Sequence, residues 1–332
     1  MRPKILVTNR VHAETLQRLA QFGEVEANDS SQPWPREEFM RRAQSADAIL
    51  AFMTDLIDRE VVRDCKSLRI VACALKGYDN FDLAACSDAG VWVSIVPDLL
   101  TEPTAELAVG LAIGLGRHIR HGDHIVRSGG FDGWRPVLYG TGLDGSTVAI
   151  VGMGRVGRAV AQRLSGFGCR IIGVDDAVEM PENVEKNGLD EALASSDYII
   201  LCAPLTPASR HLIDRGTLAR IKDGALLINI GRGSVVDEDA VLAALETGRL
   251  GGYAADVFEM EDWAILDRPS DVHPGLRAHE RTLFTPHLGS AVSAVRRAIE
   301  LRAVDNIADA LAGGRPRDAI NDPHGPESAK AS

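Results

Sequence analysis

The stretch that decides the fold runs Val148-Ala149-Ile150-Val151-Gly152-Met153-Gly154-Arg155-Val156-Gly157. Its first four residues are apolar, its end is a G-x-G-x-x-G motif, and Val160 and Leu164 continue the apolar face that Val156 begins. The motif alone is a weak signal, but here it joins a predicted strand to a predicted helix. The sequence therefore predicts a βαβ unit that binds the pyrophosphate of a dinucleotide at the helix N-terminus.

The residues around this motif indicate which dinucleotide binds. Gly152 makes the tight turn, Gly154 lets the backbone approach the pyrophosphate, and Gly157 lets the helix pack on the strand. The next predicted strand ends at Asp175, whose carboxylate is expected to accept hydrogen bonds from the adenosine ribose and to repel a 2′-phosphate. No basic residue follows before Lys186. The sequence therefore predicts NAD rather than NADP as the cofactor.

Outward from the motif, the chain divides into two arrays of predicted strands separated by helical stretches. The first array has strands at 4–8, 48–51, 69–74 and 91–94, and the second at 148–151, 170–174, 198–202, 225–230, 252–256 and 282–285. A helix is predicted over 103–119, between the arrays, and another over 292–311, after the last strand. This alternation indicates parallel βαβ units, and the continuous apolar runs indicate strands that are covered on both faces.

Length and composition bound the class of protein. At 332 residues the chain has room for two domains, and its net charge of −11 disfavours binding to nucleic acid or to an anionic membrane. No apolar run has the length of a transmembrane helix or the pattern of a secretory signal. The five cysteines are odd in number and contain no C-x-x-C pair, which indicates reduced thiols, a cytoplasmic protein and no structural metal site.

Three polar residues follow strands of the second array, where ligands bind in open α/β sheets. Arg232 follows the strand at 225–230, Glu261 the strand at 252–256, and His287 the strand at 282–285. Each alone is an ordinary loop residue, but together they match an anion-binding cation, an orienting carboxylate and a general base. We predict that these three form the catalytic set.

The sequence resembles the D-2-hydroxyacid dehydrogenase family over nearly its whole length. Four segments carry the resemblance: the G-x-G-x-x-G unit, Gly-Arg-Gly-Ser-Val-Val-Asp-Glu at 231–238, Asp-Val-Phe-Glu-Met-Glu at 256–261 and Thr-Pro-His-Leu-Gly-Ser at 285–290. The resemblance implies an α/β fold of two doubly wound parallel-sheet domains, with a Rossmann NAD-binding domain inserted into a flavodoxin-like substrate domain, and a homodimer. The expected boundaries are 1–99 for the first part of the substrate domain, 100–287 for the NAD-binding domain, 288–320 for a C-terminal helix that returns to the substrate domain, and 321–332 for a mobile tail.

Within that family, the sequence is most similar to the phosphite dehydrogenases. Long strings in both arrays carry this closer match, among them Ala74-Leu75-Lys76-Gly77-Tyr78-Asp79-Asn80-Phe81-Asp82 and Gly133-Trp134-Arg135-Pro136, whereas Thr54 and Gly231 stand where Pro and Cys are expected. Phosphite is largely a dianion near neutral pH, and Lys76 would supply a second cation opposite Arg232. We therefore expect the NAD-dependent oxidation of phosphite to phosphate, with hydride transfer to NAD.

In that reaction His287 deprotonates the attacking water, Glu261 orients the His287 ring, and Arg232 with Lys76 binds the anion; in an alternative, Arg232 helps to activate the water. The predicted substrate-binding residues are Lys76, Gly77, Met53, Trp134, Tyr139 and Ser290, and for the last four a place in the core or in a dimer contact is the alternative. The predicted cofactor-binding residues are Thr104, Gly152, Gly154, Arg155, Val156, Gly157, Asp175, Pro204 and Asp256. Two other functions stay open: reduction of a 2-keto acid such as glyoxylate or hydroxypyruvate, and an NAD-sensing binding protein with little turnover.

Overall fold

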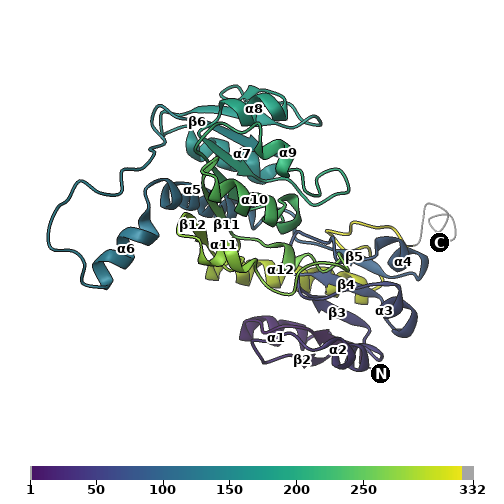
Figure 1. Ribbon diagram of the computed structural model, residues 1–332. Coiled ribbons are helices and arrows are strands. Elements are labelled where there is room, and N and C mark those ends of the chain that lie inside the picture. The colour runs from purple at the N-terminus through teal and green to yellow at the C-terminus, as the bar shows by residue number, and fades with distance from the viewer. Residues whose placement is uncertain (1, 324–332) are drawn as a thin grey trace. The chain divides into compact units, whose positions relative to one another are not determined.

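The computed structural model describes residues 2–323, and the chain divides into two compact units (Figure 1). Unit 1 contains the residues up to Leu100, Trp263–Leu266 and the residues from Val292 onward, and unit 2 contains Thr101–Asp262 and Asp267–Ala291. Each unit holds one parallel β-sheet, so the predicted α/β fold with two parallel sheets is confirmed.

Unit 1 is built on a five-stranded sheet in the order β2-β1-β3-β4-β5, in which all neighbouring strands are parallel. Its strands are β1 (Lys4–Val7), β2 (Glu24–Ala27), β3 (Ala48–Ala51), β4 (Ile70–Cys73) and β5 (Trp92–Ser94). Its helices are α1 (Ala13–Leu19), α2 (Arg36–Ala43), α3 (Arg59–Asp64), α4 (Leu83–Asp88) and α12 (Ser293–Leu311). This is the doubly wound, flavodoxin-like strand order.

Helices cover both faces of this sheet, which explains why its central strands are continuously apolar. One core packs β-strand residues such as Leu6 and Ile49 against α2, α3 and α4, and the other packs Ile5 and Leu50 against α1 and α12. The sequence did not predict β2, because its residues alternate between charged and apolar and the strand lies at the edge of the sheet.

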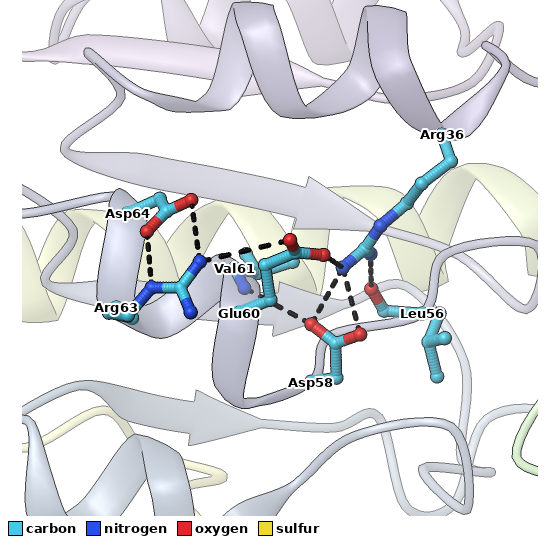
Figure 2. Close-up of polar contacts among 7 residues, drawn as sticks. All are labelled: Arg36, Leu56, Asp58, Glu60, Val61, Arg63 and Asp64. Atoms are coloured by element: carbon cyan, nitrogen blue, oxygen red, sulfur yellow. Dashed lines mark hydrogen bonds and ion pairs between the residues drawn. The ribbon is translucent and has the colours of Figure 1, made fainter.

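A polar network around α3 anchors the loop that follows β3 (Figure 2). Arg36, the first residue of α2, donates to the Leu56 carbonyl oxygen at 2.6 Å and to Asp58 Oδ1 at 2.7 Å. Asp58 in turn caps α3 by accepting from the Val61 NH at 3.1 Å. The far end of the β3–α3 loop is therefore held in place, while its near end carries Met53.

The chain after α12 lies along β5. The Ile320 NH donates to the Val93 carbonyl oxygen at 2.9 Å, and the Val93 NH donates to Asn321 Oδ1 at 2.7 Å. The tail expected from residue 321 therefore does not begin there, because the Asn321 side chain satisfies a backbone NH that the edge strand would otherwise leave unpaired. The rest of that predicted tail, from residue 324, lies outside the described residues.

Unit 2 is built on a seven-stranded parallel sheet in the order β12-β11-β10-β9-β6-β7-β8. Its strands are β6 (Thr147–Val151), β7 (Arg170–Val174), β8 (Glu185–Lys186), β9 (Tyr198–Leu201), β10 (Ala225–Asn229), β11 (Leu250–Ala255) and β12 (Thr282–Phe284). Its helices are α5 (Thr101–Gly116), α6 (Ile119–Arg127), α7 (Arg155–Leu164), α8 (Leu189–Ser195), α9 (Arg215–Leu218), α10 (Glu238–Glu246) and α11 (Pro274–Ala278), with 3₁₀ turns η1 (Gly233–Val235) and η2 (Glu259–Glu261). The strand order reverses between β6 and β9, which is where this fold binds dinucleotides.

The helix predicted over 103–119 corresponds to α5, which ends three residues earlier, and a further helix, α6, follows it. Helix α5 ends at Gly116, and His118 adopts a left-handed conformation with φ of 52° before α6 begins. The Gly116 carbonyl oxygen accepts from the Thr141 NH at 2.9 Å, so the two ends of the segment between these residues lie next to each other. Residues 119–142, which we call the arm, stand away from the sheet of unit 2 (Figure 1).

Candidate active site

The three residues predicted to form the catalytic set follow adjacent strands of unit 2. Arg232 follows β10, Glu261 lies in η2 after β11, and His287 follows β12. Strands β10, β11 and β12 are neighbours and parallel, so their carboxyl ends lie at the same edge of the sheet. The fold therefore places all three side chains at one end of unit 2.

His287 and Glu261 form a direct pair. His287 Nδ1 lies 2.6 Å from Glu261 Oε2, and both side chains are about one-third exposed, at 31% and 27%. The other oxygen, Oε1, accepts from the Phe258 NH at 3.0 Å, so the carboxylate is fixed within its own turn. Because Glu261 engages Nδ1, Nε2 is the ring nitrogen of His287 left to exchange a proton with a substrate.

Asp256 holds the turn that carries His287. The residue is 2% exposed, and its carboxylate accepts from Thr285 Oγ1 at 2.6 Å, from the Leu288 NH at 2.6 Å and from the Gly289 NH at 2.8 Å. Burial raises the pKa of Asp256, while these donors favour its charged form. His287 itself has φ of 55°, an unusual value for a residue with a side chain, so this clamp stabilises a strained backbone. The cofactor contact predicted for Asp256 stays a prediction.

Arg232 lies on a turn that is closed by its neighbours. Asn229 Nδ2 donates to the Arg232 carbonyl oxygen at 2.8 Å, and Asn229 Oδ1 accepts from the Gly231 NH at 3.1 Å. A Cβ atom on Gly231 would lie 2.5 Å from the Ala203 carbonyl oxygen. The loop after β9 thus leaves no room for a side chain at 231, which accounts physically for glycine at this position.

The glycine-rich turn between β6 and α7 fits a dinucleotide. Gly152 has φ of 93°, and a Cβ atom there would lie 2.8 Å from the Ala203 nitrogen. A Cβ atom on Gly157 would overlap the Gly152 carbonyl oxygen, whereas the space beside Gly154, the N-cap of α7, is open to 4 Å. Tight packing on both sides of an open helix N-terminus is the arrangement that binds a pyrophosphate.

Asp175 contacts this turn directly. Its Oδ2 accepts from the Met153 NH at 2.9 Å, and its Oδ1 accepts from the Ala177 NH at 2.9 Å. The carboxylate follows β7, the strand next to β6, as the sequence predicted. Asp175 therefore holds the glycine-rich turn, which the sequence did not indicate, and its predicted contact with the ribose stays a prediction.

The other residues predicted in unit 2 fall into two groups. Thr104, on α5, lies beside the turn after β12, since a Cβ atom on Gly289 would be 3.1 Å from Thr104 Oγ1; Ser290 follows in the same turn. Arg155 and Val156 form the first turn of α7, and Pro204 follows β9. Trp134 and Tyr139 lie instead on the arm and are 79% and 80% exposed, so the core alternative for both is wrong.

In unit 1, Met53, Lys76 and Gly77 lie on the loops after β3 and β4, which are adjacent strands. Asn80 joins the two loops, because its Nδ2 donates to the Met53 carbonyl oxygen at 3.2 Å and to the Asp55 carbonyl oxygen at 2.5 Å. The structure therefore brings these three predicted substrate-binding residues to one edge of the unit 1 sheet.

The sequence reasoning missed two charged groups at this edge. Arg296, on α12, donates to the Ala74 carbonyl oxygen at 3.3 Å, and burial lowers the pKa of its guanidinium. Asp55 is 7% exposed and accepts from Thr8 Oγ1 and, at 2.7 Å, from the Phe52 NH. Burial raises the pKa of Asp55 to about 6. An arginine on the inward face of a helix and an acid within an apolar string are signals that could have identified them.

Residues 2–323 contain no group of three or more His, Cys, Asp or Glu side chains that could hold a metal ion. Over the same residues, no helix is long and apolar enough to cross a membrane.

Comparison with known proteins identifies relatives over the whole chain. Residues 109–289 match the family model described as D-isomer specific 2-hydroxyacid dehydrogenase, NAD binding domain. A glyoxylate reductase of Pyrococcus horikoshii is 34% identical, with 97% of this chain and 96% of the relative covered. Among solved structures, the TT0316 protein of Thermus thermophilus aligns with a TM-score of 0.88 at 34% identity, over 96% of this chain and 99% of that one. A glyoxylate reductase from Paecilomyes thermophila aligns with a TM-score of 0.83 at 28% identity, over 98% and 99% of the two chains.

These relatives correct the expected substrate. They are named glyoxylate reductases and 2-hydroxyacid dehydrogenases, and nothing among them points to phosphite, so the expectation of phosphite oxidation is wrong. The physical argument behind it was a count of cations, Lys76 with Arg232. Two cations suit a dianion such as phosphite, and they equally suit a 2-keto acid, which has one carboxylate and an adjacent carbonyl oxygen. The number of cations therefore does not discriminate between the two substrates.

Proposed function

Because the chain belongs to the D-isomer specific 2-hydroxyacid dehydrogenase family and is an NAD-dependent enzyme of that family, we propose that it reduces a small 2-keto acid of the glyoxylate or hydroxypyruvate type to the 2-hydroxy acid. The observation that carries the proposal is the His287–Glu261 pair, at 2.6 Å, beside the turn that presents Arg232. A keto-acid reductase needs a proton donor and a cation at one edge of its nucleotide-binding sheet, and these residues provide both.

The side chains divide the chemistry as follows. NADH, when bound, supplies the hydride. The guanidinium of Arg232 binds the substrate carboxylate and polarises the carbonyl group, for which its planar pair of donors is suited. His287 gives the proton on Nε2 to the carbonyl oxygen as that oxygen becomes a hydroxyl, and Glu261 stabilises the charged ring and holds its orientation. In the reverse direction the same nitrogen accepts the proton.

Unit 1 has its own set of proposed substrate-binding residues. Lys76, Gly77 and Met53 share one edge of the unit 1 sheet, and the Lys76 ammonium is suited to an anionic substrate. Asn80 supports them by joining their two loops. We propose unit 1 as the substrate domain on this basis and unit 2 as the NAD-binding domain.

A homodimer is part of the proposal. Six apolar side chains of the arm are 55% to 80% exposed, which is unusual for large apolar residues that share one segment: Ile119, Val126, Phe131, Trp134, Val137 and Tyr139. A second copy of the chain would cover them. The five free cysteines support a reducing compartment, the cytoplasm.

The test of the proposed substrate is a spectrophotometric panel. Purified protein with NADH is offered glyoxylate, hydroxypyruvate and pyruvate, and protein with NAD is offered D-glycerate, D-lactate and phosphite. We expect the largest kcat/KM with glyoxylate or hydroxypyruvate. A larger kcat/KM with phosphite would overturn the proposal, and the absence of turnover with every compound would favour an NAD-sensing binding protein.

A further inference from the structure

Four hydrogen bonds form a closed ring beside the proposed active site, and none of the roles above uses it. The His211 NH donates to the Ser234 carbonyl oxygen at 2.7 Å, and the Ser234 NH donates to Asp262 Oδ2 at 2.6 Å. The Asp262 NH donates to the Glu259 carbonyl oxygen at 3.2 Å, and Glu259 Oε1 lies 2.9 Å from His211 Nε2. The last contact closes the ring.

This ring connects the two turns on which the proposed chemistry depends. Ser234 lies in η1, two residues after Arg232, and Glu259 opens η2, whose last residue is Glu261. The two turns are also in close contact, because a Cβ atom on Gly233 would overlap the Phe258 carbonyl group. The ring therefore joins the turn that follows Arg232 to the turn that contains Glu261, whose carboxylate contacts His287.

His211 holds a conformation that its own backbone disfavours. Its φ is 50°, in the left-handed region, which is unfavourable for a residue with a side chain. Such a conformation persists only where tertiary contacts maintain it. Here the backbone NH and the imidazole of His211 both make hydrogen bonds that belong to the closed ring. These two contacts together stabilise the left-handed conformation of His211.

The charges around Glu259 favour a donor at His211. Glu259 is largely buried, with 17% of its side chain exposed, and its backbone NH donates to Glu238 Oε1 at 3.1 Å. Burial raises the pKa of Glu259, His211 opposes that effect, and the nearby Glu238 adds to it. Two carboxylates therefore lie close together, and the contact with His211 stabilises the charged form of Glu259 against their repulsion.

We propose that His211 is a positioning residue for the reaction, which acts by holding Glu259 and so fixing the Arg232 turn against the Glu261–His287 pair. It does not touch the substrate or the cofactor in this role. The inference rests on the proposed roles of Arg232, Glu261 and His287. The hydrogen bond between His211 Nε2 and Glu259 Oε1 would thus affect both substrate binding by Arg232 and proton transfer by His287.

The experiment breaks that bond from each side. His211→Asn keeps the backbone NH and tolerates a left-handed φ but does not reach Glu259, and Glu259→Ala removes the acceptor. Both should lower kcat/KM for glyoxylate by roughly 10- to 100-fold, the cost of a misplacement of about 1 Å, while the KM for NADH stays unchanged. Because the two changes remove the same bond, the double variant should be no worse than the poorer single variant.

Two further variants separate positioning from folding. Glu259→Gln keeps an oxygen that accepts from Nε2 and should restore most of the activity that Glu259→Ala loses. Asp239→Ala is the matched control for Glu259→Ala, since it removes the acceptor of a second His–carboxylate pair, His273 Nε2 to Asp239 Oδ1 at 3.0 Å, outside the ring, and it should leave kcat/KM unchanged. If His211→Asn does not fold, the Glu259 variants alone decide the question.

The outcomes separate this inference from the proposed function. Wild-type kcat/KM in His211→Asn or Glu259→Ala, or losses that multiply in the double variant, would overturn the inference. A fall in the thermal stability of these variants with no change in their kcat/KM would also overturn it. His287→Ala is measured in the same series: if it retains turnover, the proposed roles themselves are wrong, whereas if it loses turnover and the ring variants do not, only the positioning role is lost.

Discussion

His287 is the residue on which the proposed reaction depends most. We predict that His287→Ala lowers kcat by about 10²- to 10⁴-fold, because Nε2 no longer exchanges a proton with the carbonyl oxygen. The affinity for NADH should stay close to that of the wild type, since the glycine-rich turn lies between β6 and α7 and is not altered. Steady-state initial rates of NADH oxidation give kcat, and fluorescence titration gives the affinity for NADH. A variant with near-normal kcat at neutral pH would contradict the assignment.

At Arg232 the geometry of the cation should matter as well as its charge. The Asn229 side chain closes the turn on both sides of Gly231, so the guanidinium projects from a defined backbone. We predict that Arg232→Lys raises the KM for glyoxylate by at least about 10-fold, because a single ammonium replaces a planar pair of donors. The measurement is initial rate against glyoxylate concentration at saturating NADH. Equal KM values in the two proteins would mean that only the charge is used.

Asp175 should control the choice between NAD and NADP. The contact of Oδ2 with the Met153 NH makes Asp175→Asn a better test than Asp175→Ala, because asparagine retains an oxygen that accepts from this NH. We predict that Asp175→Asn narrows the ratio of kcat/KM values for NADH and NADPH without reversing it. Repulsion of the 2′-phosphate is reduced, but no cation is added and Asp176 remains nearby. An unchanged ratio at fixed ionic strength would show that Asp175 does not face the ribose.

At the scale of elements, the loop after β3 should make unfolding depend on pH. Asp55, between β3 and α3, has a pKa raised by burial to about 6 from 3.8. Between these values the folded state binds more protons than the unfolded state, so stability falls as pH rises from about 4 to 6 and the loss is complete above pH 6. Its size is on the order of 2 to 3 kcal/mol.

Asp55→Asn should remove this dependence. We predict that the Tm of the variant, relative to that of the wild type, increases as pH is raised from 4.5 to 7. The exposed Asp88→Asn serves as the control and should show a constant difference, because its carboxylate is 73% exposed. A Tm difference for Asp55→Asn that falls or stays level over this range would contradict the assignment of the buried charge.

At the scale of the whole molecule, the arm should determine the oligomeric state. We predict that Phe131→Asp combined with Val126→Asp converts the proposed dimer to a monomer, because charges on an apolar surface that a second copy covers would cost several kcal/mol. Light scattering after size-exclusion chromatography gives the mass. Phe167, which is 39% exposed, follows α7 and lies outside the arm, and it provides the control Phe167→Asp, which should leave the proposed dimer intact. A dimer that persists in the arm variant would place the interface elsewhere.

The sequence by itself determined the fold class and the positions of the chemical groups. A strand that is buried on both faces must be apolar throughout, so β3, β4, β6, β7, β9 and β10 could be located from composition within one or two residues. The glycine-rich turn and the residues that follow β10, β11 and β12 could then be assigned to one edge of a sheet, because parallel strands share their carboxyl ends. The edge strands β2 and β8 and the end of helix α5 could not be located this way, because none of the three has a distinctive local sequence pattern.

Only the tertiary structure decided how these groups are held. His211 and Glu259 are 48 residues apart in the sequence, and Ser234 and Asp262 are 28 apart. Nothing in a local pattern identifies such contacts, because they depend on how two turns pack and on which backbone groups are then left to pair. The choice of substrate lies further still from the sequence pattern, because it is a difference between two binding free energies at one site, and residues that are common to both reactions contribute equally to each.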